Sequence, residues 1–240
     1  MSTHDSRVRA SEQVAHGTMA FHFERPAGFS FDPGQAIDVV LLEPAAVDAQ
    51  DARHTFSIVS APFESELVIA TRMRDSAFKR ALQALPLGAR VSIEGPSGAL
   101  TLHQDRARPA VFVAGGIGIT PFMSIVRQAA HDQRQQSLVL LYSNRRPEDA
   151  AYLAELQELE RHHPQFRLTA TMTSMSHSSQ TWTGSRGPID ESLLKRATAE
   201  LVKPIYYLAG PPGMVEAMRL TLNDADVSDD DIRSEEFYGY

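Results

Sequence analysis

Short runs of alternating or β-branched apolar residues fill the first hundred positions of the chain. The runs are TMAFHFE (18–24), QAIDVVLLE (35–43), TFSIVSA (55–61), ELVIATRM (66–73) and RVSIEG (90–95). Alternation with a period of two is typical of strands that bury one face, and turn clusters such as RPAG and DPG separate the runs. We therefore predict an antiparallel β-barrel or sandwich here, interrupted by one helix that Ser76 caps and that ends before Pro86 and Gly88.

The pattern changes near residue 108 to apolar strands that alternate with amphipathic helices. The predicted strands are PAVFVAG (109–115), SLVLLYS (137–143), FRLTATM (166–172), PIYYLAG (204–210) and a final strand near IRSEEF (232–237). The predicted helices occupy 121–134, 147–162, 190–198 and 213–225, with Pro147 expected at the start of the second and Asp190 capping the third. This order is the mark of β-α units around a parallel sheet. The polar stretch at 102–109 divides the chain into predicted domains at 1–105 and 106–240.

Composition narrows the possible chemistry. A net charge of −7 over 240 residues argues against a polyanion as the main ligand, so nucleic acid is not expected. The chain has no cysteine, which excludes disulfides, thiolate catalysis and cysteine-held clusters, and its histidines form no metal-binding set, so no metal is expected. No apolar run reaches membrane-spanning length and the N-terminus lacks a signal core, so we expect a soluble, cytoplasmic protein without membrane insertion.

A glycine-rich turn joins the first strand of the second half to its helix. In VFVAGGIGITPFMSIV, the turn contains Gly116, Gly118, Thr120 and Pro121. Glycines at a strand-to-helix junction let a ligand approach the backbone, and the helix N-terminus attracts a pyrophosphate. The turn could instead be purely structural, but the strand before it and the helix after it favour dinucleotide binding.

Two further turns fall at the carboxyl ends of predicted strands. YSNRRPED places Ser143, Asn144, Arg145 and Arg146 where an NAD-selective domain would carry an acid, and this suits a 2′-phosphate, although a solvated basic turn remains the alternative. YYLAGPPGMV ends at Gly210, Pro211 and Pro212. Because ligands bind outside the carboxyl ends of strands in an open α/β sheet, these turns should face one crevice with the turn at Gly116.

Six motifs occur in the order found in the ferredoxin-NADP reductase family of flavoproteins, which the chain resembles from about residue 12 to 240. They are HTFSIVSAP, SAFKRAL, AGGIGITPFMSI, YSNRRPED, YLAGPPGMV and the terminal SEEFYGY. The resemblance implies an N-terminal Greek-key barrel that binds flavin and a C-terminal Rossmann-like, NADP-binding domain of five parallel strands. It also implies an oxidoreductase in which hydride passes from nicotinamide to flavin N5.

The family's flavin motif is Arg, any residue, Tyr, Ser, in which the Arg holds flavin phosphate, the aromatic ring packs on the isoalloxazine and the Ser approaches N5. Phe56 and Ser57 match this motif, but His54 stands at the Arg position and Arg53 is displaced by one residue. Alternation along a strand puts His54 and Phe56 on one face and Arg53 and Thr55 on the other, so Arg53 cannot substitute. A neutral imidazole offers one donor where guanidinium offers a charged fork, so we predict weaker phosphate binding and partial flavin loss on purification.

Two other segments match family elements that surround the flavin. Ser76, Ala77, Phe78 and Lys79 resemble the second phosphate element, although Ser76 could be only a helix cap. The family often ends in an aromatic ring that shields the flavin; Tyr240 fits this role, with Phe237 and Glu236 as rivals for stacking and proton relay, and a frayed tail is the alternative. Ala209 stands where plant-type members carry a Cys near the nicotinamide.

The prediction is therefore a flavin-dependent NAD(P)H oxidoreductase, with FAD preferred over FMN and NADPH over NADH. Ser57 and Thr120 would flank the site of hydride transfer. Because no iron–sulfur domain is encoded, the acceptor is expected to be separate: a ferredoxin, a flavodoxin, a free flavin or an oxygenase component. A monomer is expected. The alternatives are a reductase that uses loosely bound flavin as substrate and a non-catalytic, nucleotide-responsive binding module.

Overall fold

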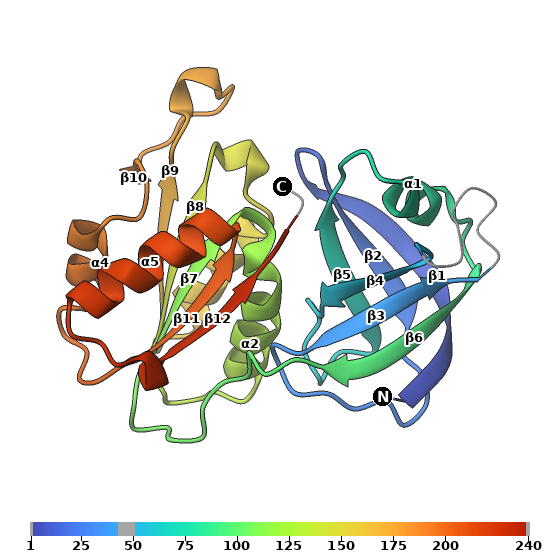
Figure 1. Ribbon diagram of the computed structural model, residues 1–240, viewed down its shortest axis with the longest axis horizontal. Coiled ribbons are helices and arrows are strands. Elements are labelled where there is room, and N and C mark those ends of the chain that lie inside the picture. The colour runs from blue at the N-terminus through green and yellow to red at the C-terminus, as the bar shows by residue number, and fades with distance from the viewer. Residues whose placement is uncertain (1, 43–50, 239–240) are drawn as a thin grey trace.

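The computed structural model of the protein describes residues 2–42 and 51–238. Its strands form two six-stranded sheets, one in each of two domains that lie side by side in Figure 1. The first sheet is built from β1 (Ser2–Ala15), β2 (Thr18–Glu24), β3 (Ala36–Leu41), β4 (Arg53–Ser57), β5 (Glu66–Arg72) and β6 (Arg90–Ser97), with helix α1 (Ala77–Ala84) between the last two.

The first sheet is an antiparallel barrel. Its strand order is β4-β3-β6-β1-β2-β5, with every neighbouring pair antiparallel, and a bridge from Ile58 to Ile69 brings the two edge strands together. Alternate side chains fill its interior, among them Phe21, Phe23 and Ile37, each at most 1% exposed. The predicted barrel is confirmed.

The long strand β1 was not predicted. Only Ser6 and Val8 are buried among its fourteen residues, so it carries almost no apolar alternation for a sequence pattern to detect. Its backbone instead pairs with two neighbours: residues 2–7 with β6 and residues 8–15 with β2. The strand is therefore held by ladder hydrogen bonds more than by buried side chains.

The second sheet is parallel throughout, with the order β10-β9-β8-β7-β11-β12. Its strands are β7 (Ala110–Gly115), β8 (Leu138–Asn144), β9 (Phe166–Met172), β10 (Ser185–Arg186), β11 (Ile205–Gly210) and β12 (Ile232–Glu236). The predicted α/β sheet is confirmed, but it has six strands where five were expected. The extra strand, β10, has only two residues, which pair with Thr171 and Met172, and so short an element has no detectable period.

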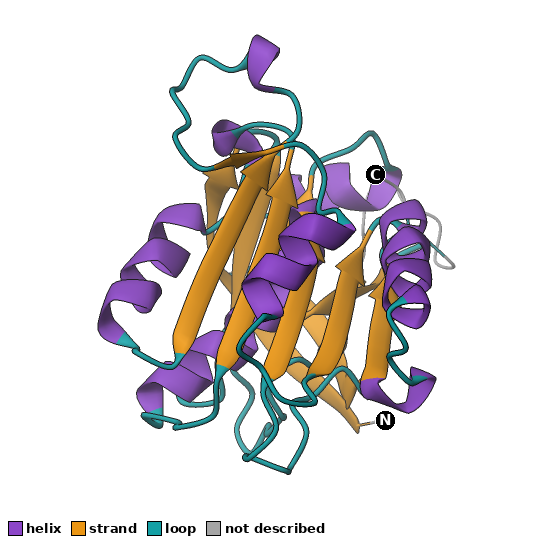
Figure 2. Ribbon diagram, turned by 90° about the vertical axis from the view of Figure 1, so that its left-hand side faces the viewer, coloured by secondary structure: helices purple, strands orange, loops and turns teal. Residues whose placement is uncertain are grey.

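Helices cover both faces of the parallel sheet, as Figure 2 shows. They are α2 (Ile119–His131), α3 (Leu153–His162), α4 (Glu191–Thr198) and α5 (Pro212–Asp224). Alternate residues of β7 divide between the faces: Phe112 packs in the cluster with α2 and α3, and Val113 in the cluster with α4 and α5. None of these helices, nor α1, is long and apolar enough to cross a membrane, within the residues that the structure describes.

Helix α2 lies between its own sheet and the barrel (Figure 1). Its buried residues Phe122 and Ile125 belong to one apolar cluster with Val59 and Ala70 of the barrel half. The two domains therefore share a continuous core across their seam, which limits independent movement.

Helix α3 begins later than predicted. Residues Pro147–Asp149 form a single 3-10 turn, and the helix starts at Leu153 after Tyr152 adopts a left-handed conformation with φ 60°. Burial explains the difference, because Ala150 and Ala151 turn inward against the core and interrupt what the sequence presents as one amphipathic run. The 3-10 turn that begins at Pro147 therefore lies close after the carboxyl end of β8.

Candidate active site

The carboxyl ends of the parallel strands meet the open side of the barrel. The chain crosses from β7 to β8 on one side and returns to β11 on the other, so the crevice between β7 and β11 is a topological switch point. Three cavities lie along this seam. They are the interdomain pocket, the turn pocket and the α1 pocket, each defined below by its lining residues.

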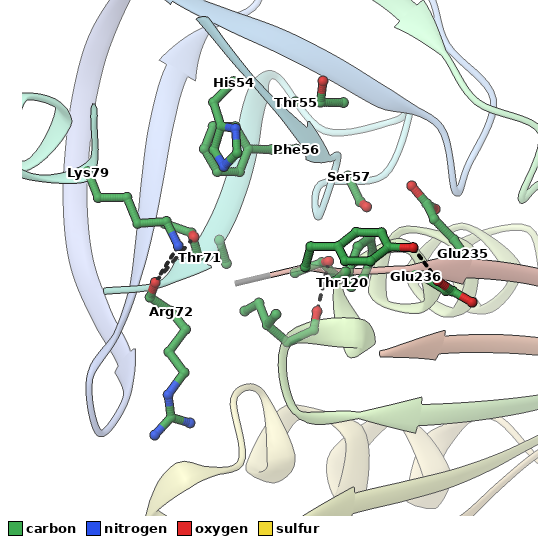
Figure 3. Close-up of a pocket in the computed structure, with 14 residues that line it drawn as sticks. His54, Thr55, Phe56, Ser57, Thr71, Arg72, Lys79, Thr120, Glu235 and Glu236 are labelled. Carbon is green, nitrogen blue, oxygen red and sulfur yellow. Dashed lines mark hydrogen bonds between the residues drawn. The ribbon is translucent and has the colours of Figure 1, made fainter. Parts of the chain in front are cut away.

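The interdomain pocket takes walls from both domains, as Figure 3 shows. Barrel residues of its lining include His54, Thr55, Phe56, Ser57, Thr71, Arg72 and Lys79, and the second domain contributes Ile117, Thr120, Glu235, Glu236, Phe237 and Tyr238. The geometric expectation that Ser57 and Thr120 open onto one space is thus met.

Ser57 and Thr120 differ in how their hydroxyls are satisfied. Thr120 Oγ1 donates to the carbonyl of Ile117 at 2.9 Å, which fixes its rotamer at the start of α2. Ser57 is only 5% exposed, and its Oγ has no hydrogen-bond partner among residues 2–42 and 51–238. A buried hydroxyl without a partner costs free energy, so its orientation toward the pocket fits a polar ligand atom that would complete it.

Along β4, neighbouring residues face opposite ways. Arg53 binds carboxylates on adjacent strands, with Nη2 at 2.5 Å from Asp38 Oδ2 and 2.7 Å from Glu94 Oε2. His54 faces the other side, where its ring centroid lies 4.9 Å from that of Phe56. The charge of Arg53 is therefore shared with two carboxylates, although the residue also borders the α1 pocket described below.

The environment of His54 favours the neutral imidazole. Burial and the nearby Lys79 ammonium lower the pKa of His54, with Asp38 opposing them. The ring also lies 5.4 Å from Phe78, centroid to centroid. The position that the family motif gives to a guanidinium therefore holds an uncharged, partly enclosed donor at neutral pH.

The α1 pocket adjoins the interdomain pocket and is lined in part by His54, Arg74, Ser76, Ala77, Phe78 and Lys79. Ser76 caps the helix, since its Oγ accepts from the Lys79 backbone N–H at 3.2 Å. Lys79 Nζ donates to the Arg72 carbonyl at 2.8 Å, and burial together with Arg74 lowers the pKa of Lys79. The first-turn N–H groups and the cations of Arg53, Arg74 and Lys79 thus surround one space, which Asp51 and Asp75 also line. The balance of these groups suits an anion.

The turn pocket lies beyond Arg72, on the sheet side. Its lining comprises Arg72, Arg74, Gly115, Gly116, Ser143, Asn144, Arg145, Asp149, Thr173, Pro211 and Met214. Gly116 has φ +55° with no atom within 4 Å of where a Cβ would stand, so its backbone is open to a ligand. The Asn144 amide nitrogen is buried and has no hydrogen-bond partner within the part of the chain that the structure describes, so it adds an unused donor.

Arg145 and Arg146 are placed differently. Arg145 lines the turn pocket, whereas Arg146 makes a bidentate pair with Asp149, at 2.8 Å from Nε to Oδ2 and 2.8 Å from Nη2 to Oδ1. The Asp149 side chain is 3% exposed, and the bond from Arg146 lowers the pKa of Asp149. Arg146 lies outside the pocket lining, so the structure separates two residues that the sequence presented as equivalent.

Four of the expected cofactor-binding residues pack instead of lining these pockets: Gly118, Pro121, Gly210 and Pro212. Gly118 is the clearest case, because a Cβ there would lie 2.1 Å from the Ala209 carbonyl oxygen. Its role is the close approach of the turn to β11. Pro212 is the first residue of α5, where a missing N–H costs no hydrogen bond.

The C-terminal segment supplies the remaining wall. Tyr240 lies outside the described residues. Glu236, Phe237 and Tyr238 line the interdomain pocket; Tyr238 is 79% exposed and its hydroxyl donates to Glu236 Oε2 at 2.5 Å.

Sequence reasoning missed Glu235, which also lines this pocket and whose pKa is raised by burial. Two successive acids at the end of a strand were the available signal, because successive side chains point to opposite faces and cannot be equally solvated. It also missed Arg72, the last residue of β5, and Arg74 just after it, because nothing in the local sequence links them to the second domain.

Comparisons with known proteins agree with this architecture. Residues 112–220 match the family described as the oxidoreductase NAD-binding domain. The chain is 26% identical to the glycine betaine monooxygenase reductase subunit of Chromohalobacter salexigens. The matched region makes up 88% of this chain but only 58% of that relative. A solved ferredoxin NADP+ reductase from Neisseria gonorrhoeae, with bound FAD and NADP, has the same fold with a TM-score of 0.80, at 21% identity and covering 98% of this chain and 99% of that one.

The match that decides the family spans both domains. Ferredoxin-NADP reductase B of Sorangium cellulosum is 30% identical over 212 residues, which are 87% of this chain and 82% of that protein. The order of the two domains, a barrel followed by a parallel sheet, and the pocket at their seam agree with the name of this relative. The chain belongs to the ferredoxin-NADP reductase family of flavoprotein oxidoreductases.

Proposed function

We propose that this chain is an NAD(P)H-dependent reductase that holds FAD at the seam and passes electrons to a separate acceptor. The observation that carries the proposal is that Ser57 and Thr120, from different domains, line one pocket, in which the described part of the chain offers the Ser57 hydroxyl no partner. Bound FAD accepts a hydride from a reduced nicotinamide and can release electrons to a second acceptor. The protein's task is then orientation of the two rings.

The residues present fit the two cofactors. The flavin ring suits the wall formed by His54, Phe56 and Ser57, and its phosphates suit the α1 pocket with Ser76 and Lys79. The nicotinamide nucleotide suits the turn pocket, where the open Gly116 backbone and the buried Asn144 amide provide donors. We also propose that the two domains divide between residues 105 and 106, because the barrel strands all precede this point and the parallel strands all follow it.

Two acids on β12 have different proposed roles. Glu235 is half-buried and burial raises its pKa, which suits a group that takes up and releases a proton beside the pocket. Glu236 is exposed and accepts the hydroxyl of Tyr238, which fixes that ring at the pocket mouth. Thr120, held by the Ile117 carbonyl, presents a fixed wall opposite Ser57.

The acceptor is proposed to be an oxygenase component or a ferredoxin-like protein. The Chromohalobacter relative is named as a monooxygenase reductase subunit, and the Sorangium relative as a ferredoxin-NADP reductase. This chain spans 58% of the former, so the activity of the whole protein belongs to the proposal. We propose further that NADPH is preferred, because Arg145, Arg72 and Arg74 gather at the turn pocket.

The placement of His54 supports a second function, reduction of a flavin that binds loosely and leaves. A neutral imidazole replaces the charged fork, and Arg53 is engaged elsewhere. An absorbance spectrum of the purified protein before and after anaerobic NADPH separates the two. Flavin bands that copurify and bleach support the bound cofactor, whereas a colourless protein that consumes NADPH only with added flavin supports the second function. Nucleotide binding without consumption in either case would contradict both.

A further inference from the structure

Helix α2 is joined to the barrel by two side chains that reach backbone carbonyls directly after β4. Ser124 Oγ donates to the Ser60 carbonyl at 2.7 Å, and Arg127 Nη1 donates to the Val59 carbonyl at 3.3 Å. Both donors belong to the second domain and both acceptors to the first. These bonds therefore cross the seam between the domains.

The guanidinium of Arg127 is fixed by a second set of contacts within its own domain, so Arg127 is not a mobile surface arginine. Its Nε and Nη2 bind the two carboxylate oxygens of Glu155 on α3, at 2.6 and 2.8 Å. Glu64 lies 3.5 Å from Nη1, the Tyr152 ring lies 5.4 Å from the guanidinium carbon, and the side chain is 15% exposed. A guanidinium that is bound by both oxygens of one carboxylate has little freedom to move, so Nη1, the nitrogen that reaches the barrel, has a defined position.

The two accepting carbonyls are fixed as well. The Val59 N–H donates to the Val68 carbonyl at 2.7 Å, and Ser60 Oγ accepts from the Val68 N–H at 3.0 Å. The segment after β4 is thus anchored to β5. Ser124 is fully buried, so water does not compete for its bond.

This connection ends at the two residues that flank the proposed site of hydride transfer. Ser57 lies two residues before Val59 in extended chain, and Thr120 lies four residues before Ser124, which is about one helical turn or 6 Å. No other linkage between the strand of Ser57 and the helix of Thr120 is needed to fix their separation. The path through backbone and side chains is short and rigid on both sides.

We propose that Ser124 and Arg127 are positioning residues that set the separation between whatever Ser57 and Thr120 hold. This inference rests on the proposed function, because hydride transfer depends steeply on the separation of the two rings. A misplacement of about 1 Å can cost about a hundredfold in rate. Neither residue lines the interdomain pocket, so neither touches the reacting atoms.

Ser6 provides a matched control for Ser124. Its Oγ donates to the Glu24 carbonyl at 2.7 Å and it is 4% exposed, but both partners lie within the barrel. Ser124→Ala and Ser6→Ala therefore each remove one buried hydroxyl bond of equal length to a carbonyl. Only the first of them breaks a bond across the seam.

The test measures flavin reduction by stopped flow at saturating NADPH and hydrogen exchange of the unliganded chain. Ser124→Ala should lower the rate constant about tenfold and Arg127→Met by more, with the KM for NADPH and the FAD dissociation constant changed less than about twofold. Arg127→Lys, which keeps the charge, should fall between Arg127→Met and the wild type. Exchange should quicken at both residues 57–61 and 117–124 in Ser124→Ala, but at neither segment in Ser6→Ala.

The inference is overturned if Ser124→Ala matches Ser6→Ala in both rate and exchange, or if its rate falls only in proportion to lost flavin. Failure of the proposed function looks different: the wild type itself would then reduce no flavin with either nucleotide. In that case the hydrogen-exchange measurement alone tests whether Ser124 and Arg127 have the positioning role. Unchanged exchange at both segments in Ser124→Ala and Arg127→Met would refute the positioning role as well.

Discussion

Each domain contains one pair of adjacent basic residues near the seam. The pairs are Arg53 with His54 on β4 and Arg145 with Arg146 after β8, and their environments can be compared directly. In each pair one guanidinium is ion-paired with acids of its own domain, and the other residue lines a pocket. Arg53 also borders the α1 pocket, but Asp38 and Glu94 share its charge. Asp38 and Glu94 hold Arg53, and Asp149 holds Arg146. Nearby carboxylates, more than the cation itself, therefore decide which basic residue is available to a ligand.

The pair after β8 should show the largest difference. Arg145→Gln should raise the KM for NADPH about tenfold to a hundredfold, because a charge-assisted bond to phosphate is worth about 1.5–3 kcal/mol. The KM for NADH should change much less. Arg146→Lys, which keeps a cation beside Asp149, should change the ratio of the two constants by less than about twofold. Equal effects of both substitutions on steady-state kinetics would contradict the separation seen here.

The pair on β4 should respond to restoring the guanidinium. His54→Arg should tighten FAD binding about fivefold to tenfold, measured by fluorescence titration, because a charged fork replaces one neutral donor.

The pH dependence of FAD binding gives an internal check on the same substitution. The pKa of His54 is lowered, so the wild-type imidazole gains its charge only as the pH falls below about 6.5, and FAD should bind more tightly there. His54→Arg and His54→Gln should both lack this dependence. A wild-type affinity that is flat from pH 7.5 to about 5 would remove His54 from the phosphate site.

The Arg146 pair should also appear in the pH dependence of stability. The folded pKa of Asp149 is lowered by Arg146, so its stabilising contribution is complete above the unfolded value of about 3.9 and is lost as the pH falls through the folded value. Urea midpoints of the wild type should therefore fall more between pH 6 and 3 than those of Asp149→Asn. Parallel pH profiles would show that the pair contributes nothing to folding.

The smallest effect is expected at Arg53. Arg53→Gln should leave the FAD dissociation constant within about twofold of the wild-type value, since its guanidinium faces Asp38 and Glu94. The thermal midpoint should fall only slightly, because the side chain is nearly half exposed and solvent weakens such pairs. A large loss of flavin affinity in the same titration would mean that Arg53, which borders the α1 pocket, contacts the FAD phosphates despite its carboxylate partners.

Local periodicity predicted most of the fold, because strands such as β7 and helices such as α2 carry strong apolar patterns. It failed for β1, whose fourteen residues are mostly exposed, and for β10, which has only two. In the site, the alternation of β4 matches the side-chain partners, with Arg53 and Thr55 bonded to Asp38 and His54 packed on Phe56, but Arg53 and His54 both border the α1 pocket. The enclosure of Glu235 and the approach of Arg72 depend on neighbours that only the folded chain brings close. The pair of Arg146 with Asp149 is local, since the two residues are three positions apart, and the sequence analysis overlooked it.

Arg72 lines both the interdomain pocket and the turn pocket, while its carbonyl restrains Lys79 at the α1 pocket. One residue thus borders two of the three pockets and is hydrogen-bonded to a residue that lines the third. Occupancy of one compartment should therefore alter affinity in the next, and thermodynamic reciprocity makes the factor identical in both directions. Calorimetric titration of nucleotide with and without flavin, and the reverse, should give the same coupling constant, which Arg72→Gln should bring close to unity.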